Sequence, residues 1–449
     1  MIDRRDFLGS LGLLALGACG PHAVRAYPVE SSAPDYLATA REVGTYLRGQ
    51  AVATEHGQRW RKSPDEPGTM SRDLYHGAAG PALFFLELHR ATGDATYLRD
   101  AQLGGDELIA TIPEAPGIWD VGLYGGLAGH AFVFAELARA TGEARHRDAA
   151  ARSITLLEAA SSDDGHGGAT YGGSTDILYG AAGVILGLLH GRPSSPAIAF
   201  ATRLGDGLVG LAQTTPHGRR WLMRPDDDYE MPNFSHGTAG VAYALARLHQ
   251  VTGEARFLEA ALAGASHLLG LASSVGDTCL LPHVLPKGED RFYLGFCHGP
   301  AGTARLFHQL HVVTGDATWA NWFQRSVNGV LVSGVPTLRA PGFWDNVGQC
   351  CGTASLAELM LSMHRLDGDP HYLELAHELE VDLLSRASQA AGGGLEWIHA
   401  ENRAEPYWKQ AYTGWMQGAA GIGSVLIRLA GHDGREAWKI ALPDNPFPV

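Results

Sequence analysis

The sequence predicts an all-α fold, a single-domain α/α toroid in which seven helical hairpins close into a ring. Three observations predict it. A short glycine motif recurs seven times along the chain. In six copies a second glycine follows the last motif residue by 13 residues, as from Gly80 to Gly93. The stretch between these two marks is apolar and long enough for a helix, and such self-similarity is typical of repeat architectures.

The glycine motif marks the expected start of a helix in every copy. Each copy is followed by an apolar run without internal proline, such as Leu83 to Leu88, sufficient for about three helical turns. Small residues in the motif permit tight entry turns and a close approach of neighbouring helices. The seven copies are His76–Gly80, Gly125–Gly129, Tyr179–Gly183, His236–Gly240, His298–Gly302, Cys351–Ser355 and Gln417–Gly421.

The second glycine marks the expected end of that helix. Gly93 and its equivalents suit the left-handed C′ position that ends many helices. An acidic residue often follows, as in Asp94 and Glu143, and favours the start of a second helix through capping and the helix dipole. The third copy departs from the rule, with Pro196 in the expected place. Each repeat is therefore predicted to be a helix, a tight turn, a second helix and a return loop of variable length.

Seven hairpins can stack as an open solenoid or close into a ring. A solenoid needs polar repeats that cap its two ends. The first and last copies here carry the full motif, which argues against such caps. We therefore expect a closed toroid over residues 35–440, followed by a C-terminal tail over residues 441–449.

The N-terminal segment resembles a targeting signal and is set apart from the fold. Arg4-Arg5 followed by an apolar run to Ala18 resembles a twin-arginine export signal, and the run is too short to span a bilayer. Leu16 to Cys19 resembles a bacterial lipobox, in which Cys19 is lipidated; a plain cleaved signal is the alternative. We expect a signal over residues 1–19 and a tether over residues 20–34. The protein is then exported to the periplasm or cell surface and held at the membrane by its lipid.

The overall charge restricts the possible partners. The chain has 34 basic and 48 acidic residues, and its formal net charge is −14. Nucleic acids are bound by basic surfaces, so we expect no nucleic-acid partner. Anionic lipid is disfavoured for the same reason, and membrane contact is expected only through the lipid anchor.

Three of the five cysteines fall at equivalent places in neighbouring repeats. In a ring, the residues just before each glycine motif lie at one end, and copies five and six place Cys297, Cys350 and Cys351 there. Three thiolates suit tetrahedral Zn²⁺ with a fourth position open for substrate. The alternatives are a vicinal disulfide between Cys350 and Cys351, or a disulfide between Cys297 and Cys279, since an exported protein meets an oxidising compartment.

Three motif runs in combination resemble the lanthionine synthetase C (LanC)-like family, over nearly the whole of residues 35–440. The resemblance implies a seven-barrel α/α toroid with zinc at its mouth. It also implies that Cys297, Cys350 and Cys351 are the ligands, as in the subgroup with a Cys-Cys-Gly motif, whereas the third ligand in the family is usually histidine. The three runs are Gly295-Phe296-Cys297-His298-Gly299, Gly348-Gln349-Cys350-Cys351-Gly352 and Gly414-Trp415-Met416-Gln417-Gly418-Ala419-Ala420-Gly421.

The activity implied by this resemblance is addition of a thiolate to a dehydroalanine or dehydrobutyrine, either cyclising a dehydrated peptide or joining a small thiol to it. His236 matches the family's active-site histidine and is expected to protonate the α-carbon. Asp176 matches the family's acid and is expected to orient His236. Each residue also has a structural interpretation, His236 as a helix cap and Asp176 as a carboxylate at a helix N-terminus.

The chain departs from the family at two positions near the first zinc cysteine. Peptide cyclases of the family carry an arginine shortly before that cysteine, where this chain has Tyr293. The residue after the cysteine is His298, where the cyclases often carry tyrosine. These departures leave the substrate open.

Two further functions compete with the thioether-forming enzyme. One is an exported lipoprotein that binds thiols or peptides without catalysis; retention of His236 beside the cysteines favours the enzyme. The other is a carbohydrate-active toroid, which would use paired carboxylates among Asp120, Asp176 and Asp345. That interpretation leaves the cysteine cluster unexplained.

Overall fold

The computed structural model describes residues 2–3, 34–66, 68–338, 346–399, 407, 409–431 and 440–447. Apart from Ile2 and Asp3, the predicted signal over residues 1–19, including Arg4-Arg5 and Cys19, lies outside the described residues, as does nearly all of the predicted tether. Trp344 and Asp345, which precede the sixth glycine motif, also lie outside them. Among the described helices, none is both long and apolar enough to cross a membrane.

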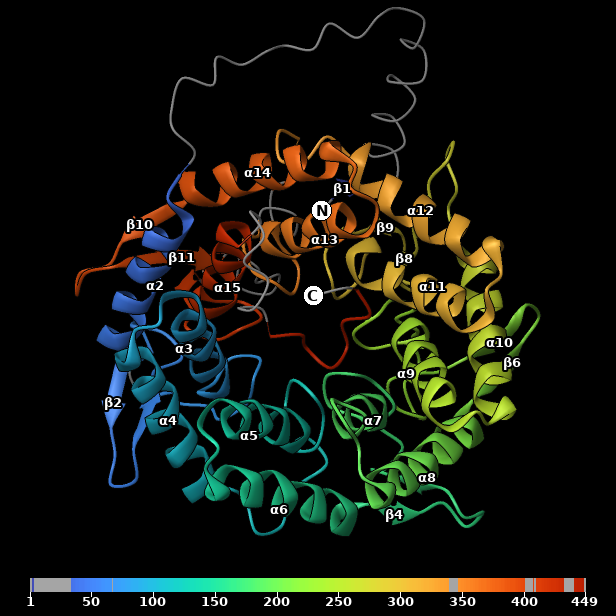
Figure 1. Ribbon diagram of the computed structural model, residues 1–449. Coiled ribbons are helices and arrows are strands. Elements are labelled where there is room, and N and C mark those ends of the chain that lie inside the picture. The colour runs from blue at the N-terminus through green and yellow to red at the C-terminus, as the bar shows by residue number, and fades with distance from the viewer. Residues whose placement is uncertain are drawn as a thin grey trace, which may run out of the picture.

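The helices form two concentric rings, as Figure 1 shows. Each glycine motif opens a helix of the inner ring, and the outer helices pack around it. The inner helices are α3 (Ala79–Thr92), α5 (Leu127–Thr141), α7 (Ala181–Leu188), α9 (Thr238–Thr252), α11 (Pro300–Thr314), α13 (Thr353–Asp367) and α15 (Ala419–Ala430). The outer helices are α2 (Tyr36–Gln50), α4 (Ala95–Ala110), α6 (Ala144–Ala160), α8 (Ser195–Leu211), α10 (Ala255–Leu271), α12 (Ala317–Leu331) and α14 (Pro370–Ser385). The predicted α/α toroid is confirmed.

The seventh hairpin joins the two ends of the chain. The helix that packs outside α15 is α2, from the start of the described chain, rather than a helix that follows α15 (Figure 1). Tyr46 of α2 donates a hydrogen bond from its hydroxyl to the carbonyl of Ala411, 2.8 Å away, ahead of α15. The ring is therefore closed by an N-terminal element, which the sequence analysis did not assign to a repeat.

The predicted tight turns are present. Gly93, Gly142, Gly253, Gly315 and Gly368 each end an inner helix with φ between 69° and 77°, in the left-handed region. The acidic residue that follows caps the next helix in three cases, since the carboxylates of Asp94, Asp316 and Asp369 accept backbone N–H groups two residues later. The second glycine of the seventh copy, Gly434, lies outside the described residues. The third inner helix is shorter than the others and ends at Leu188, in keeping with the irregular third copy.

Short strands, which the all-α prediction did not include, lie in the return loops, and one further strand, β1, comes from the N-terminal segment. Within the described residues they form five small antiparallel sheets, with strand orders β1-β9-β8, β10-β11-β12, β2-β3, β4-β5 and β6-β7. The strands are β1 (Ile2–Asp3), β2 (Ala51–Ala53), β3 (Gln58–Trp60), β4 (Ser162–Asp163), β5 (Ala169–Thr170), β6 (Gln213–Thr215), β7 (Gly218–Arg220), β8 (Pro282–Val284), β9 (Gly288–Phe292), β10 (Ala387–Gln389), β11 (Leu395–His399) and β12 (Gln410–Ala411).

The loops that precede the inner helices are linked into a closed circuit of backbone hydrogen bonds, which we call the motif ring. Seven N–H···O=C bonds of 2.8–3.2 Å run from each loop to the next, and the last returns to the first. All the motif loops therefore lie at one end of the barrel, as predicted. The bonds run from Tyr75 to Tyr124, Tyr124 to Leu178, Ile177 to Ser235, Ser235 to Cys297, Cys297 to Cys350, Cys350 to Met416 and Met416 to Tyr75.

The C-terminal segment, residues 440–447, lies at the centre of the toroid (Figure 1). Asp444 is fully buried and accepts a hydrogen bond of 2.9 Å from the hydroxyl of Tyr124. It also forms an ion pair of 3.2 Å with Arg305 of α11. The backbone N–H of Ile440 donates to Glu87 of α3. Polar contacts with several inner helices thus hold this segment beneath the motif ring.

Candidate functional site

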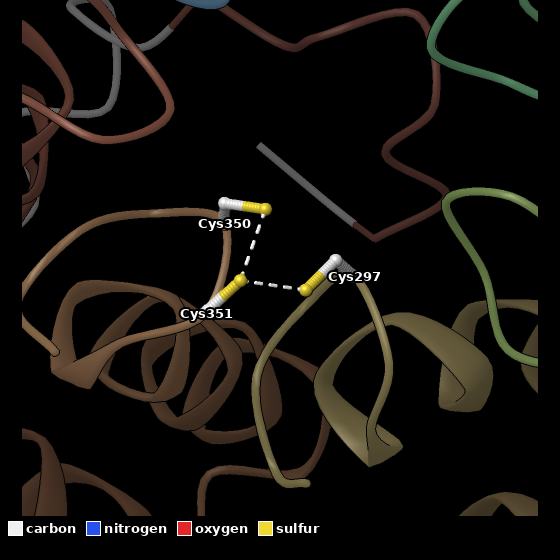
Figure 2. Close-up of side chains that lie close together, drawn as sticks. All are labelled: Cys297, Cys350 and Cys351. Carbon is white, nitrogen blue, oxygen red and sulfur yellow. Dashed lines mark hydrogen bonds between the residues drawn. The ribbon is translucent and has the colours of Figure 1, made fainter. Parts of the chain in front are cut away.

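The three predicted cysteines occupy neighbouring links of the motif ring. Cys297 lies in the loop before α11, and Cys350 and Cys351 lie in the loop before α13 (Figure 2). The N–H of Cys297 donates to the carbonyl of Cys350 at 2.9 Å, which fixes the two loops side by side. Gly295 permits this approach, because a Cβ atom there would lie 2.8 Å from the Cα atom of Cys351.

The three side chains converge on one buried point. The Sγ atoms of Cys297 and Cys351 are 2.7 Å apart, those of Cys350 and Cys351 are 3.2 Å apart, and all three lie within 4.8 Å of one another (Figure 2). Tetrahedral zinc with Zn–S bonds of about 2.3 Å places its sulfur ligands about 3.8 Å apart, so these sulfur atoms would have to separate by up to about 1 Å to bind it. With that adjustment the group could hold a metal ion.

The alternative disulfides are absent from the described residues. None of Cys279, Cys297, Cys350 and Cys351 forms a disulfide within the described part of the chain. Cys279 lies outside the cluster, and burial raises the pKa of its thiol to about 11. The closest sulfur pair, Cys297 with Cys351, is neither of the two pairs that the sequence analysis considered.

Mutual hydrogen bonding polarises the cluster. Hydrogen bonds from the thiols of Cys297 and Cys351, with a further one from Tyr75, hold the pKa of Cys350 well below its usual value. Burial raises the pKa of Cys351 well above its usual value. The site thus favours the thiolate of Cys350 over that of Cys351, and a cation at this point would relieve the cost of burying negative charge.

His236 and Asp176 form a hydrogen-bonded pair, as predicted. Nδ1 of His236 lies 2.7 Å from Oδ2 of Asp176. The Asp176 side chain is fully buried, whereas that of His236 is 18% exposed. The second oxygen of Asp176 accepts the backbone N–H of Tyr179 at 3.1 Å, so the carboxylate also caps its own loop. The Asp176 side chain thus contacts both His236 and the backbone of its own motif loop.

His236 lies in the motif loop next to the one that carries Cys297. Ser235, its neighbour, donates from both its backbone N–H and its hydroxyl to the carbonyl of Cys297, at 3.1 and 3.0 Å. The ring of His236 is 5.8 Å from that of His298, which follows Cys297. The electrostatic effect of His236 is the smallest of the contributions that lower the pKa of Cys350. An acid–base pair and a thiol cluster therefore share the mouth of the barrel.

Several aromatic residues at this mouth were missed by the sequence analysis as site residues. Tyr179 stacks on His236 with ring centroids 6.2 Å apart and an interplanar angle of 14°. His283 contacts both Tyr293 and His298, with ring centroids 4.5 and 4.4 Å apart. Tyr293 and His298, the two positions at which the chain departs from the family pattern, thus lie close together, and His283 of β8 contacts both. Only the motif register could have indicated Tyr179, which precedes Gly180 as His236 precedes Gly237.

The remaining predicted residues do not join this group. Cys19 and Asp345 lie outside the described residues. Asp120 lines a separate small cavity with Arg72 and His130, and its carboxylate accepts the backbone N–H of Gly117. Asp176 makes its contacts with His236 and the Tyr179 backbone instead. The paired carboxylates expected of a carbohydrate-active site are not assembled by the described residues.

Comparison with known proteins agrees with this arrangement. The chain matches the family described as lanthionine synthetase C-like protein over residues 68–442. It is similar to the solved structure of nisin cyclase, with a TM-score of 0.60 and 15% sequence identity, covering 82% of this chain and 89% of that chain. It is also similar to the Lin0763 protein from Listeria innocua, with a TM-score of 0.52 and 12% identity, covering 89% and 98%. None of the curated proteins compared with it matches.

The structural likenesses, at identities this low, bear on the fold and agree with the α/α toroid. The sequence match is of a different kind, because it covers most of the chain and includes the motif loops, the cysteine cluster and the His236–Asp176 pair. The chain therefore belongs to the lanthionine synthetase C-like protein family.

Proposed function

We propose that this protein is a zinc-dependent enzyme that forms a thioether by adding a thiolate to a dehydroalanine or dehydrobutyrine. The observation that carries the proposal is the joint placement of three buried cysteine sulfurs and the His236–Asp176 pair on adjacent links of the motif ring. A structural metal site alone would not require an acid–base pair beside it.

Cys297, Cys350 and Cys351 are the residues that would hold zinc. Three soft thiolate donors suit zinc, and three protein ligands leave a fourth position open, which is typical of a catalytic site. Bound zinc would supply a positive centre at which a substrate thiol is stabilised as thiolate at neutral pH.

The chain's own residues then act on the dehydroresidue. As the substrate sulfur forms its bond to the β-carbon, the π-electron pair of the double bond moves to the α-carbon and carbonyl as an enolate. His236 donates one proton to the α-carbon, which balances the proton lost by the thiol. Asp176 accepts a hydrogen bond at Nδ1 of His236, so that Nε2 is the nitrogen available to the substrate. No oxidant or reductant is consumed.

The substrate class follows from the family and from the site. The solved relative with the higher TM-score here is a nisin cyclase, which supports a dehydrated peptide as substrate, with a small thiol as the second possibility.

We further propose that the protein is exported and anchored through Cys19, because Arg4-Arg5 and the lipobox-like segment precede it. Membrane fractionation of the Cys19→Ala variant tests this placement: release into the soluble fraction supports it, and unchanged fractionation contradicts it.

Metal content, free-thiol count and turnover together test the enzymatic proposal. The purified protein should contain about one zinc per chain and convert a peptide carrying both cysteine and dehydroalanine to its thioether. Cys297→Ala should lose the zinc and the activity, whereas Cys279→Ala, which alters a buried thiol outside the cluster, should keep both. Peptide binding without thioether formation by the zinc-loaded protein would overturn the enzymatic assignment and leave a binding protein.

A further inference from the structure

The mouth of the toroid carries an exposed aromatic side chain on the side of His236. Trp119 is 46% exposed and its neighbour Ile118 is 47% exposed, in the return loop between α4 and α5. Single exposed apolar residues, such as Val251 and Val312 at the ends of α9 and α11, are ordinary on a protein surface. A second adjacent exposed pair, Leu331 and Val332, lies at the end of α12, so what distinguishes Ile118 and Trp119 is their place beside the candidate active site.

Two ring contacts connect this tryptophan to the candidate acid, and a third contact, with Arg224, holds the indole. The guanidinium carbon of Arg224 lies 3.9 Å from the centre of the Trp119 ring. Tyr179 meets Trp119 edge to face, with ring centroids 5.4 Å apart and an interplanar angle of 84°. Tyr179 in turn stacks on His236. The exposed indole is thus continuous with the candidate site through a single tyrosine.

Local hydrogen bonds brace the loops that carry these side chains. The carboxylate of Asp120 accepts the N–H of Gly117, which closes the turn that presents Trp119. The carboxylate of Asp227 accepts the N–H of Arg224 at 2.9 Å, and the N–H of Asp227 donates to the Arg224 carbonyl at 3.2 Å. Because both loops are held before any substrate arrives, less conformational freedom is lost when one binds.

We propose that Trp119, Arg224 and Tyr179, the aromatic platform, bind an aromatic side chain of a dehydrated peptide beside its reacting residue. This inference rests on the proposed function and specifies its substrate. Arg224 and Tyr179 hold the indole in place while nearly half of Trp119 remains exposed for an incoming ring. Ile118 adds apolar surface beside it. A small thiol with charged groups would gain little from this surface, whereas aromatic rings stack favourably on tryptophan.

The spacing sets the position of that aromatic residue in the peptide. Two ring contacts, of 5.4 and 6.2 Å between centroids, separate Trp119 from His236. An extended peptide advances about 3.3–3.6 Å per residue. Because the path through Tyr179 sets the largest possible separation, the aromatic residue belongs within about three residues of the dehydroresidue that His236 protonates.

The test compares two synthetic peptides in the zinc-loaded full chain. Both carry a cysteine and a dehydroalanine, and they differ only in having Phe or Ala two residues from the dehydroalanine. Unreactive analogues with Ala in place of dehydroalanine give binding constants by calorimetry, independently of turnover. We expect Trp119→Ala to weaken binding of the Phe peptide about tenfold, at unchanged zinc content, with little effect on the Ala peptide. Trp119→Phe should restore most of the affinity, and Val312→Ala is the control for loss of an exposed apolar side chain.

The outcomes separate this inference from the proposed function. Equal affinity of the wild type for both peptides, or an equal loss on both in Trp119→Ala, would overturn the aromatic platform even if thioethers form. Glutathione serves as the small charged thiol in a parallel assay. If its addition to dehydroalanine required Arg224, while the affinity for neither peptide depended on Trp119, the aromatic platform would be overturned in favour of a small-thiol site. A Trp119-dependent preference for the Phe peptide without any thioether product would support the platform while the enzymatic proposal fails.

Discussion

The Nδ1 atom of His236 lies 2.7 Å from Oδ2 of Asp176, although the two residues are 60 positions apart in the chain. They come from the third and fourth motif loops, which are joined by the backbone bond from Ile177 to Ser235. The buried carboxylate of Asp176 therefore orients the partly exposed imidazole of His236, because the motif ring holds their two loops side by side.

We expect Asp176→Asn to lower kcat for thioether formation about 10²- to 10⁴-fold, because an amide in place of the carboxylate no longer stabilises the Nδ1–H tautomer and the charged form of His236. The remaining side-chain oxygen can still accept the N–H of Tyr179, so folding and zinc content should be retained. Steady-state kinetics with a dehydroalanine peptide measure the effect. A kcat within twofold of the wild type would remove the pair from the mechanism.

We expect Cys351→His to keep zinc but to slow thioether formation on the order of tenfold. A neutral imidazole donates less negative charge than a thiolate, so the substrate sulfur should become less nucleophilic. Zinc analysis and single-turnover kinetics measure the two quantities separately. Cys351→Ala, which should lose the metal, is the matched control, and an unchanged rate in Cys351→His would show that the third thiolate has no electronic role.

Removal of zinc should make the cluster sensitive to oxidation. The Sγ atoms of Cys297 and Cys351 are the closest sulfur pair, so chelated protein treated with oxidised glutathione should form a disulfide between these residues. Two thiolates lose two electrons, which reduce the glutathione disulfide. Peptide mapping identifies the linked pair, and zinc-loaded protein treated in parallel should stay reduced. A Cys350–Cys351 linkage instead would contradict the arrangement of the sulfur atoms.

Stability should fall as pH rises because of Glu380 in α14. Burial raises the pKa of this carboxyl from 4.5 to about 8. The unfolded chain therefore ionises first, and the folded state becomes less stable between about pH 4.5 and 8, as the unfolded chain releases its proton before the folded one. Glu380→Gln should flatten this dependence and stabilise the protein at pH 8 by on the order of 2 kcal/mol.

Urea unfolding at pH 5 and pH 8 measures that difference. Glu378→Gln, an exposed glutamate on the same helix, is the matched control and should leave the pH dependence unchanged. If the free energy of unfolding changed equally between pH 5 and pH 8 in Glu380→Gln and the wild type, Glu380 would not be held neutral in the folded protein.

Loss of the buried carboxylate of Asp444 should destabilise the toroid. Asp444→Ala leaves Arg305 buried without its partner, and breaking such a pair costs about 3–5 kcal/mol. The double variant Arg305→Met with Asp444→Leu removes both charges and should regain most of the stability. Urea unfolding of both variants tests the assignment, and a single variant as stable as the wild type would mean that the C-terminal segment does not contribute to folding.

The fold was largely predictable because its signal is repeated. Seven glycine motifs, six of them with a constant step to a second glycine, indicate a repeated helical hairpin, and the left-handed turns at Gly93 and Gly142 confirm the step. The closing helix was not predictable in this way. The segment Tyr36–Gln50 carries no glycine motif, and its place beside α15 is determined by tertiary packing at the junction of the two chain ends.

The site was predictable to the extent that the ring determines it. The register placed Cys297, Cys350 and Cys351 at one level, and their sulfur atoms converge there. Residues such as Tyr75 and Trp119 were not predictable. An aromatic residue in a loop is more often part of a core, and only the contacts show that Tyr75 reaches Cys350 and that Trp119 remains exposed.

The motif ring allows the return loops to vary in sequence while the positions of the catalytic groups stay fixed. The spacing between ligand loops is set by one hydrogen bond from each loop to its neighbour, so it does not depend on how many residues lie between Cys297 and Cys350. Return loops can therefore lengthen, shorten or change composition without displacing the reacting groups. A chain built in this way can acquire new substrates by altering loops such as the one bearing Trp119, while its chemistry is inherited intact.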